Sequence, residues 1–352
     1  DFAQKILEVV FESINSGNYY PTYCGGLAGV GWALIHLSEH NFIDKENLDV
    51  LDEIDKFLFN AMKDFISRNY YDFLHGASGI AYYFTKRIDQ NLNVNEYLKY
   101  YIEKLSQYVI NDEDTGTAKM ISTIYNADNK QSEVYNLSLS HGMSSIVIIL
   151  NEIARKVQES DRAKKIARGF LNYTISKKNK FDSYNYSLYP SSVPLNDILD
   201  DKSSSSRLGW CYGDLGNGFA FKSASVTYKE AAEFFNNKAS EIFRNLEKRK
   251  DPVLQVINDA GICHGAAGLV CIINSLSNRY SEKVYSELEN YWIDITLNFY
   301  KDKKGIQGFS KFMNNNYTYD TSLLCGTTGV ALSLMKSIGK YRTNWAELLL
   351  IF

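Results

Sequence analysis

Six glycine-centred segments of one form recur along the chain and restrict what it can fold into. In five of them a second glycine follows the leading glycine after three residues, and in the third segment Ser145 takes its place. The intervals between leading glycines leave room for two helices and their connections each time. The leading glycines are Gly26, Gly76, Gly142, Gly213, Gly265 and Gly326. The repeat therefore predicts a series of helical hairpins.

The two segments of each predicted hairpin differ in polarity. Between the glycine motifs, apolar residues recur at helical spacing on one face, with charges on the other. Two such sets are Leu51, Ile54, Leu58, Met62 and Phe65, and Tyr285, Leu288, Trp292 and Ile295. After each motif the segment is apolar on almost all sides, as in Ile146 to Leu150. Amphipathic outer helices around buried inner helices predict an all-α fold, an α/α toroid, in a single domain over residues 1–352.

Two insertions interrupt this pattern, near residues 111–131 and 176–206. The second is rich in Ser, Asn, Asp and Lys and shows no helical periodicity. A long non-periodic segment in a compact domain is usually functional or partly disordered. Since it leads directly into Arg207, we expect it to lie at the rim of the site and to contact substrate.

Composition excludes several classes of protein. The formal net charge is −3 and no run of Lys and Arg occurs, which argues against a nucleic-acid partner. No apolar run approaches the 18 residues of a membrane span, and the first residues are amphipathic rather than typical of a signal peptide. Five cysteines, an odd number, predict reduced thiols or metal ligands rather than a disulfide framework. The expected compartment is the cytoplasm.

The glycines themselves need a physical reason, because glycine inside a helix costs roughly 1 kcal/mol relative to alanine. We expect each motif to begin an inner helix, where glycine permits a tight turn and close approach between neighbouring inner helices. Helix packing alone would account for the glycines. The unpaired N–H groups of such helix starts would also point at whatever lies in the centre of the ring.

When the repeats are aligned on the leading glycine, most of the cysteines and histidines fall at the two positions before it, which we call the two columns. Two residues before it lie Cys24, Leu74, Ser140, Cys211, Cys263 and Leu324. One residue before it lie Gly25, His75, His141, Tyr212, His264 and Cys325. In a toroid these residues would surround one end of the central cavity, so four cysteines and three histidines would face a common space.

Three of these residues form a candidate zinc site. Cys263 and His264 adjoin at one predicted helix start, and Cys211 comes from the preceding repeat. Zinc takes cysteine sulfur and histidine nitrogen in tetrahedral geometry, and a catalytic site keeps one position open. By spacing alone, ordinary buried thiols remain the alternative.

The segment WCYGDLG followed by CHGAAG, within repeated Gly-x-x-Gly hairpins, resembles the lanthionine synthetase C-like (LanC-like) family of cyclases. The resemblance covers essentially the whole chain. It implies a toroid of about seven inner and seven outer helices, although only six motifs are visible, and one zinc ion held by Cys211, Cys263 and His264. It also implies closure of thioether rings, in which cysteine thiols of a precursor peptide add to dehydroalanine or dehydrobutyrine.

The resemblance further implies roles for four residues. His141 matches the acid/base, Arg207 the arginine that polarises the substrate carbonyl, Asp72 an acidic position that orients His141, and Tyr212 the tyrosine after the zinc cysteine. Without the resemblance, His141 would be a histidine at a helix start with its hydrogen bonds satisfied, and Arg207 a solvated arginine. Asp72 would be a helix cap and Tyr212 a packing residue.

Three residues of the two columns stay outside the implied site. His75 departs from the family pattern, and Cys24 and Cys325 are expected to be small buried side chains that line the ring. If either cysteine were a fourth ligand, the site would be closed and structural.

The expected partners are a dehydrated precursor peptide with its leader, a dehydratase and an export transporter, in a complex at the inner face of the membrane. Two other functions remain open: addition of glutathione to dehydroamino acids, and peptide binding without catalysis around a structural zinc. The chain length fits a stand-alone cyclase, and a domain of a larger synthetase is the alternative.

Overall fold

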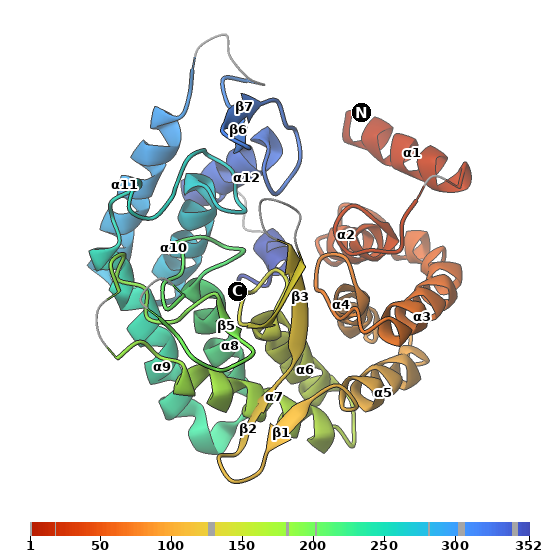
Figure 1. Cartoon of the computed structure of the whole chain (residues 1–352). Helices are drawn as coiled ribbons and strands as arrows, with labels where there is room; N and C mark the ends of the chain where they lie inside the picture. The colour runs from red at the N-terminus through yellow and green to blue at the C-terminus, as the bar shows by residue number, and fades with distance from the viewer. Residues whose placement is uncertain are drawn as a thin grey trace. The chain divides into compact units, whose positions relative to one another are not determined.

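The computed structural model describes residues 2–17, 19–125, 131–180, 183–200, 203–280, 282–301, 307–339 and 344–352. Twelve α-helices dominate this part of the chain (Figure 1). They are α1 (Phe2–Asn15), α2 (Leu27–Glu39), α3 (Leu51–Ser67), α4 (Ala77–Arg87), α5 (Val94–Leu105), α6 (Met143–Lys156), α7 (Asp161–Ser176), α8 (Asp214–Thr227), α9 (Ala232–Arg244), α10 (Ala266–Tyr280), α11 (Lys283–Asn298) and α12 (Thr327–Ile338). Short 3₁₀ helices are η1 (Lys45–Leu48), η2 (Lys229–Ala231), η3 (Asn245–Lys248) and η4 (Trp345–Leu349).

The chain packs as two compact units. One comprises Asp1–Gln107 with Lys156–Ser160, and the other Tyr108–Arg155 with Asp161–Phe352. The first unit contains α1 to α5 and η1, and the second contains α6 to α12 except for the last residue of α6, the other 3₁₀ helices, and all the strands of the described residues. The expected single domain stays a prediction.

The even-numbered helices are the predicted inner helices. Each begins directly after a leading glycine, and α4, α8 and α10 are buried along most of their length. The odd-numbered helices are amphipathic: α3 buries all five predicted apolar residues, and α11 buries three of four, with Ile295 half-buried. In the second unit, α9 packs along α8 and α11 along α10 (Figure 1). The described residues thus hold six inner and six outer helices, one fewer of each than the resemblance implies.

The leading glycines are required by their own loops. A Cβ at any of the six would lie 2.4 to 2.6 Å from the backbone oxygen of the residue six positions earlier, closer than real Cβ atoms come. At the glycines that cap α2, α4, α8 and α12 the backbone is extended, so left-handed freedom is not the reason. The predicted approach to a neighbouring repeat instead holds at Gly216, whose Cβ position is 2.6 Å from Cβ of Leu139.

The two insertions contain strands. The first forms a hairpin of β1 (Ile110–Asp112) with β2 (Thr117–Lys119), and then β3 (Ile121–Tyr125). The following β4 (Gln131–Asn136) pairs antiparallel with β3 and with β5 (Ser192–Pro194) of the second insertion. Residues 126–130 of the first insertion lie outside the described residues. A further hairpin, β6 (Lys311–Met313) with β7 (Asn316–Thr318), precedes α12. No helix of the described residues is long and apolar enough to cross a membrane.

Candidate metal centre

Backbone hydrogen bonds link the loops that precede the inner helices of the second unit. The N–H of Ser140 donates to the carbonyl of Cys211 (3.4 Å), that of Cys211 to the carbonyl of Cys263 (3.1 Å), and that of Cys263 to the carbonyl of Leu324 (2.7 Å). All four residues belong to the column two positions before the leading glycine. In the first unit, Cys24 donates to Leu74 in the same way (2.8 Å). Within each unit, equivalent positions of successive repeats are therefore adjacent in space.

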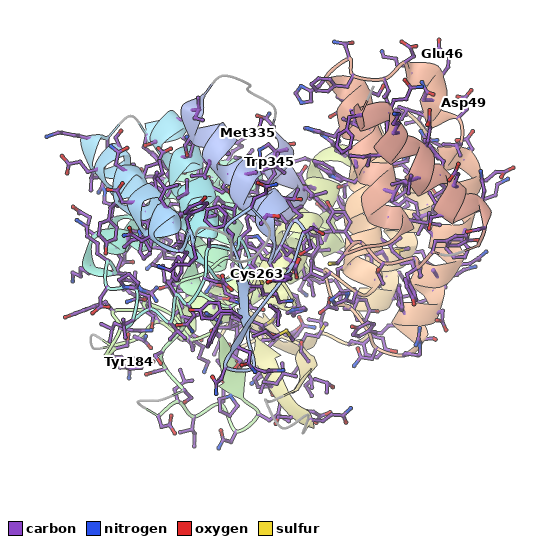
Figure 2. The ribbon with its side chains drawn as sticks, turned by 90° about the horizontal axis from the view of Figure 1, so that it is seen from above. Glu46, Asp49, Tyr184, Cys263, Met335 and Trp345 are labelled. Atoms are coloured by element: carbon purple, nitrogen blue, oxygen red, sulfur yellow. The ribbon has the colours of Figure 1, made fainter. Side chains whose placement is uncertain are left out.

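These backbone hydrogen bonds bring the three predicted zinc ligands together. The two Sγ atoms of Cys211 and Cys263 and a ring nitrogen of His264 all lie within 4.8 Å of one another. In the part of the chain that the structure describes, no other group of three His, Cys, Asp or Glu residues is so arranged. Cys211 is buried, whereas Cys263 and His264 are half-buried. Figure 2 labels Cys263 within the second unit.

The donor set fits zinc. Two thiolates and one imidazole are ligands that zinc prefers, and three protein donors leave one tetrahedral position for a substrate. At Cys211 the surroundings favour the deprotonated state that a metal needs: hydrogen bonds from Cys263 and then His264 hold the pKa of its thiol well below its usual value, against the effect of burial. The same contact with Cys211 raises the pKa of His264. In Cys263, hydrogen bonds with Cys211 and Cys325 raise the pKa.

Arg207 lies beside this group. Its Nη2 donates to the carbonyl of Val256 (2.6 Å) and more weakly to that of His264 (3.5 Å), and its positive charge contributes to the lowered pKa of Cys211. Its Nε is buried and has no hydrogen-bond partner among the described residues. The sequence-based alternative of a fully solvated arginine is therefore wrong, since Arg207 is held half-buried against the site.

His141 and Tyr212 occupy the same position in neighbouring repeats and face each other. Their ring centroids are 5.5 Å apart, with an interplanar angle of 35°. Both side chains are half-buried, and the backbone N–H of His141 donates to Oγ of Ser138 (3.3 Å). Because Tyr212 directly follows Cys211, this contact places the His141 ring next to the loop that carries a predicted zinc ligand.

Asp72 lies in the first unit, so its expected pairing with His141 stays a prediction. Its carboxylate accepts a hydrogen bond from the backbone N–H of His75 (2.7 Å), and His75 is exposed. Ser138 and Ser322 accept the same bond, from His141 and Cys325 (3.3 Å in each), at the equivalent position of their repeats. Asp72 thus performs a turn-stabilising role that a serine fills elsewhere.

Cys325 departs from the expectation of an inert buried side chain. It is half-buried, and its thiol hydrogen-bonds to Cys263, which with the positive charges of His264 and Lys311 lowers its pKa to about 7. Sequence reasoning placed Cys325 in a column next to the site but did not predict this contact. Cys24 lies in the first unit, half-buried.

A buried ion pair, also missed from the sequence, supports the loop that carries Cys211. Asp214, three residues after Cys211, accepts hydrogen bonds from Arg249 Nη1 (2.6 Å) and from the backbone N–H of Leu188 (2.8 Å). Arg249 Nη2 also donates to the carbonyl of Ser206 (2.7 Å), the residue before Arg207. An acidic residue in the first turn of α8 was the only sequence signal, and it is typical of many helices.

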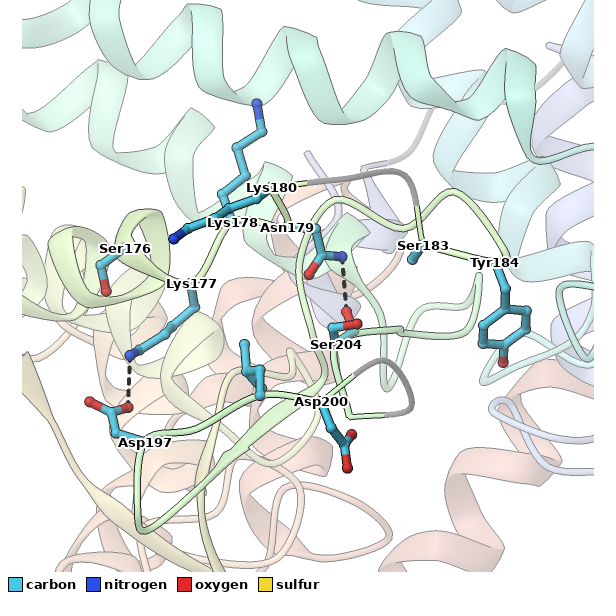
Figure 3. Close-up of a pocket in the computed structure, with 11 residues that line it drawn as sticks. Ser176, Lys177, Lys178, Asn179, Lys180, Ser183, Tyr184, Asp197, Asp200 and Ser204 are labelled. Atoms are coloured by element: carbon cyan, nitrogen blue, oxygen red, sulfur yellow. Dashed lines mark hydrogen bonds and ion pairs between the residues drawn. The ribbon is translucent and has the colours of Figure 1, made fainter.

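The second insertion also surrounds a polar cavity of about 740 Å³. Its lining includes three lysines, and Figure 3 shows the ion pair of Lys177 with Asp197 (2.8 Å) and the hydrogen bond from Asn179 to the carbonyl of Ser204 (2.9 Å). Tyr184, another lining residue, is well separated from Cys263 in Figure 2. This cavity is therefore distinct from the candidate metal centre, and substrate contact by the insertion stays a prediction.

Comparison with known proteins identifies the family and the fold. The family described as lanthionine synthetase C-like protein matches residues 1–350. Among solved structures, nisin cyclase superposes with a TM-score of 0.74 at 19% sequence identity, over 99% of this chain and 85% of that one. No curated protein sequence matches the chain. The likeness confirms the predicted fold class, an all-α fold of the toroid type.

Proposed function

The chain belongs to the lanthionine synthetase C-like family, and we propose that it is a zinc-dependent cyclase that forms thioether rings in a dehydrated precursor peptide. In this reaction a cysteine thiol adds to the β-carbon of dehydroalanine or dehydrobutyrine, and a proton then adds to the α-carbon. The products are lanthionine and methyllanthionine. The structural likeness to nisin cyclase agrees with a peptide cyclase.

The observation that carries the proposal is the convergence of Cys211, Cys263 and His264 within 4.8 Å. Zinc held there would supply a fourth coordination position, at which a substrate thiol is deprotonated and presented as a thiolate. Cys211 and Cys263 as thiolates already balance the charge of the ion. A substrate thiolate at the remaining position would give the site surplus negative charge, which would keep that sulfur nucleophilic.

Arg207 provides the positive charge that the addition needs. When the sulfur–carbon bond forms, the electrons of the double bond move towards the substrate carbonyl and give an enolate. The guanidinium of Arg207 is half-buried, and its positive charge acts on Cys211, so it is the proposed partner of that oxygen. The bonds from its Nη2 to Val256 and His264 hold the guanidinium in place.

His141 is the proposed proton donor to the α-carbon of the enolate. A histidine titrates near neutral pH, so it can give this proton and take another from the substrate thiol or from water. Its contact with the Tyr212 ring (5.5 Å) restricts the orientation of the imidazole. We assign Tyr212 and Asp72 to positioning this histidine.

The experiment uses a synthetic peptide that carries one dehydroalanine and one cysteine, with and without its leader. Ring closure leaves the peptide mass unchanged but removes the thiol, so alkylation with iodoacetamide followed by mass spectrometry separates product from substrate. We expect closure with the wild type and with the control Cys271→Ala, whose thiol is buried in α10. We expect loss of closure in Cys211→Ala and a rate roughly 100-fold lower in His141→Asn.

The same experiment tests the other two functions. Glutathione added to the mixture would attach to dehydroalanine and increase the peptide mass if the protein were a glutathione-adding enzyme. Binding of the peptide without loss of its thiol would indicate a binding protein. The dehydratase and transporter partners, and the cytoplasmic site of action at the inner face of the membrane, belong to this proposal through family membership alone.

A further inference from the structure

The thiol of Cys325 lies beside that of Cys263, one of the proposed zinc ligands. Its thiol hydrogen-bonds to that of Cys263, and neither cysteine is in a disulfide. Cys325 is not one of the three residues whose donor atoms converge within 4.8 Å. Both thiols are half-buried, whereas Cys271, in the same unit, is fully buried. Of these three thiols, only Cys263 and Cys325 therefore combine partial exposure with mutual contact.

The backbone keeps the two cysteines together. The N–H of Cys263 donates to the carbonyl of Leu324, the residue before Cys325, at 2.7 Å. Two residues before Cys263, a Cβ built on Gly261 would lie 3.2 Å from the Cα of Cys325. The loops that begin α10 and α12 thus run side by side at the two cysteines. A disulfide needs such an approach of two chain segments, with little backbone movement.

We propose that Cys263 and Cys325 are the site of a reversible disulfide, formed with a peroxide as oxidant, that removes Cys263 from the metal centre. The disulfide itself is argued from the close approach of the two loops at Cys263 and Cys325. Its effect on zinc rests on the function proposed above.

The chemistry balances with one molecule of hydrogen peroxide. The sulfur of Cys325 attacks one peroxide oxygen, the oxygen–oxygen bond breaks, and a sulfenic acid and one water result. The sulfur of Cys263 then attacks the sulfenic sulfur, the sulfur–oxygen bond breaks, and the sulfenic hydroxyl leaves as a second water with the proton of the Cys263 thiol. Two thiols have been oxidised to one disulfide, and a dithiol reductant reverses the change.

Loss of Cys263 leaves Cys211 and His264 as the only protein donors of the predicted set. Two donors do not make a zinc site of either the structural or the catalytic type. Oxidation should therefore release the ion and stop ring closure, and reduction should allow it to bind again. Cys325 would then be a redox control point rather than a fourth ligand.

The test treats the purified full chain with hydrogen peroxide and follows two readouts. Peptide mapping under non-reducing conditions identifies the disulfide, and a chromophoric chelator measures released zinc. We expect a Cys263–Cys325 linkage in the wild type and in Cys271→Ala, with zinc release that dithiothreitol and added zinc reverse. In Cys325→Ser we expect the same initial zinc content and release about tenfold slower.

Two results would overturn the inference: a Cys211–Cys263 linkage in place of the predicted one, or equally fast oxidation of Cys325→Ser. Circular dichroism and zinc content, measured before oxidation on Cys325→Ser and on a second variant, Cys325→Ala, show whether loss of this thiol disturbs the fold. If the wild type held no zinc, the proposed function would fail, while peptide mapping would still decide whether this disulfide forms.

Discussion

Replacing Arg249 by methionine should destabilise the second unit more than the loss of an exposed ion pair would. The guanidinium and the Asp214 carboxylate are each 2% exposed and 2.6 Å apart. Arg249 also donates to Gln255 Oε1 (2.9 Å) and to the carbonyl of Ser206 (2.7 Å). Methionine keeps the apolar stem but leaves the Asp214 charge buried without its partner. Removing one member of a buried ion pair costs roughly 3–5 kcal/mol, because the remaining charge loses its compensation.

Urea unfolding followed by far-ultraviolet circular dichroism measures this cost, provided that the slope with denaturant stays constant. The matched control is Lys283→Met, which breaks the exposed pair with Glu287 (3.1 Å; side chains 90% and 62% exposed) and should change the free energy of unfolding by less than about 1 kcal/mol. Adding Asp214→Asn to Arg249→Met should recover roughly 2 kcal/mol, since the unpaired charge is removed. An Arg249→Met cost no larger than that of Lys283→Met would refute the reasoning.

Three further predictions concern other parts of the chain. Burial lowers the pKa of His36 to about 4, so only the unfolded state gains a proton between pH 6.5 and 4. The free energy of unfolding of the wild type should therefore fall by up to about 3 kcal/mol over that range, relative to His36→Phe. Equal pH profiles of the two proteins in urea unfolding would contradict this. Gly213→Ala should lower the free energy of unfolding by about 2–3 kcal/mol, because the alanine Cβ would lie 2.5 Å from the carbonyl oxygen of Arg207. An unchanged melting temperature would be the contrary result. Asp72→Ser should keep the free energy of unfolding within about 1 kcal/mol, as Ser138 fills the same turn position, but slow ring closure roughly tenfold; unchanged closure would remove Asp72 from the site.

The fold was predictable because its main signal is local. Each leading glycine marks a point where a loop folds back over the start of its helix, and alanine would not fit at that point. The alternation of buried and amphipathic helices follows from hydrophobic periodicity. The strands of the two insertions were not predicted, because β5 is three residues long and exists only through its pairing with β4.

The candidate site was predictable to the extent that it lies in the two repeat columns. Cys211, Cys263 and His264 converge because equivalent positions of successive repeats are joined by backbone hydrogen bonds. The contact of Cys325 with Cys263 also lies in these columns, but it depends on side-chain directions that no alignment gives. The support from Arg249 was not predictable, because a single arginine in a polar stretch is usually exposed.

The most direct test of the account is the zinc content of the purified wild type and of Cys211→Ala, measured by inductively coupled plasma mass spectrometry. We predict one zinc per chain in the wild type and a loss of that zinc in the variant, with the fold of both verified by circular dichroism. A well-folded wild type without zinc, or a variant that retains it in full, would contradict the proposed metal centre.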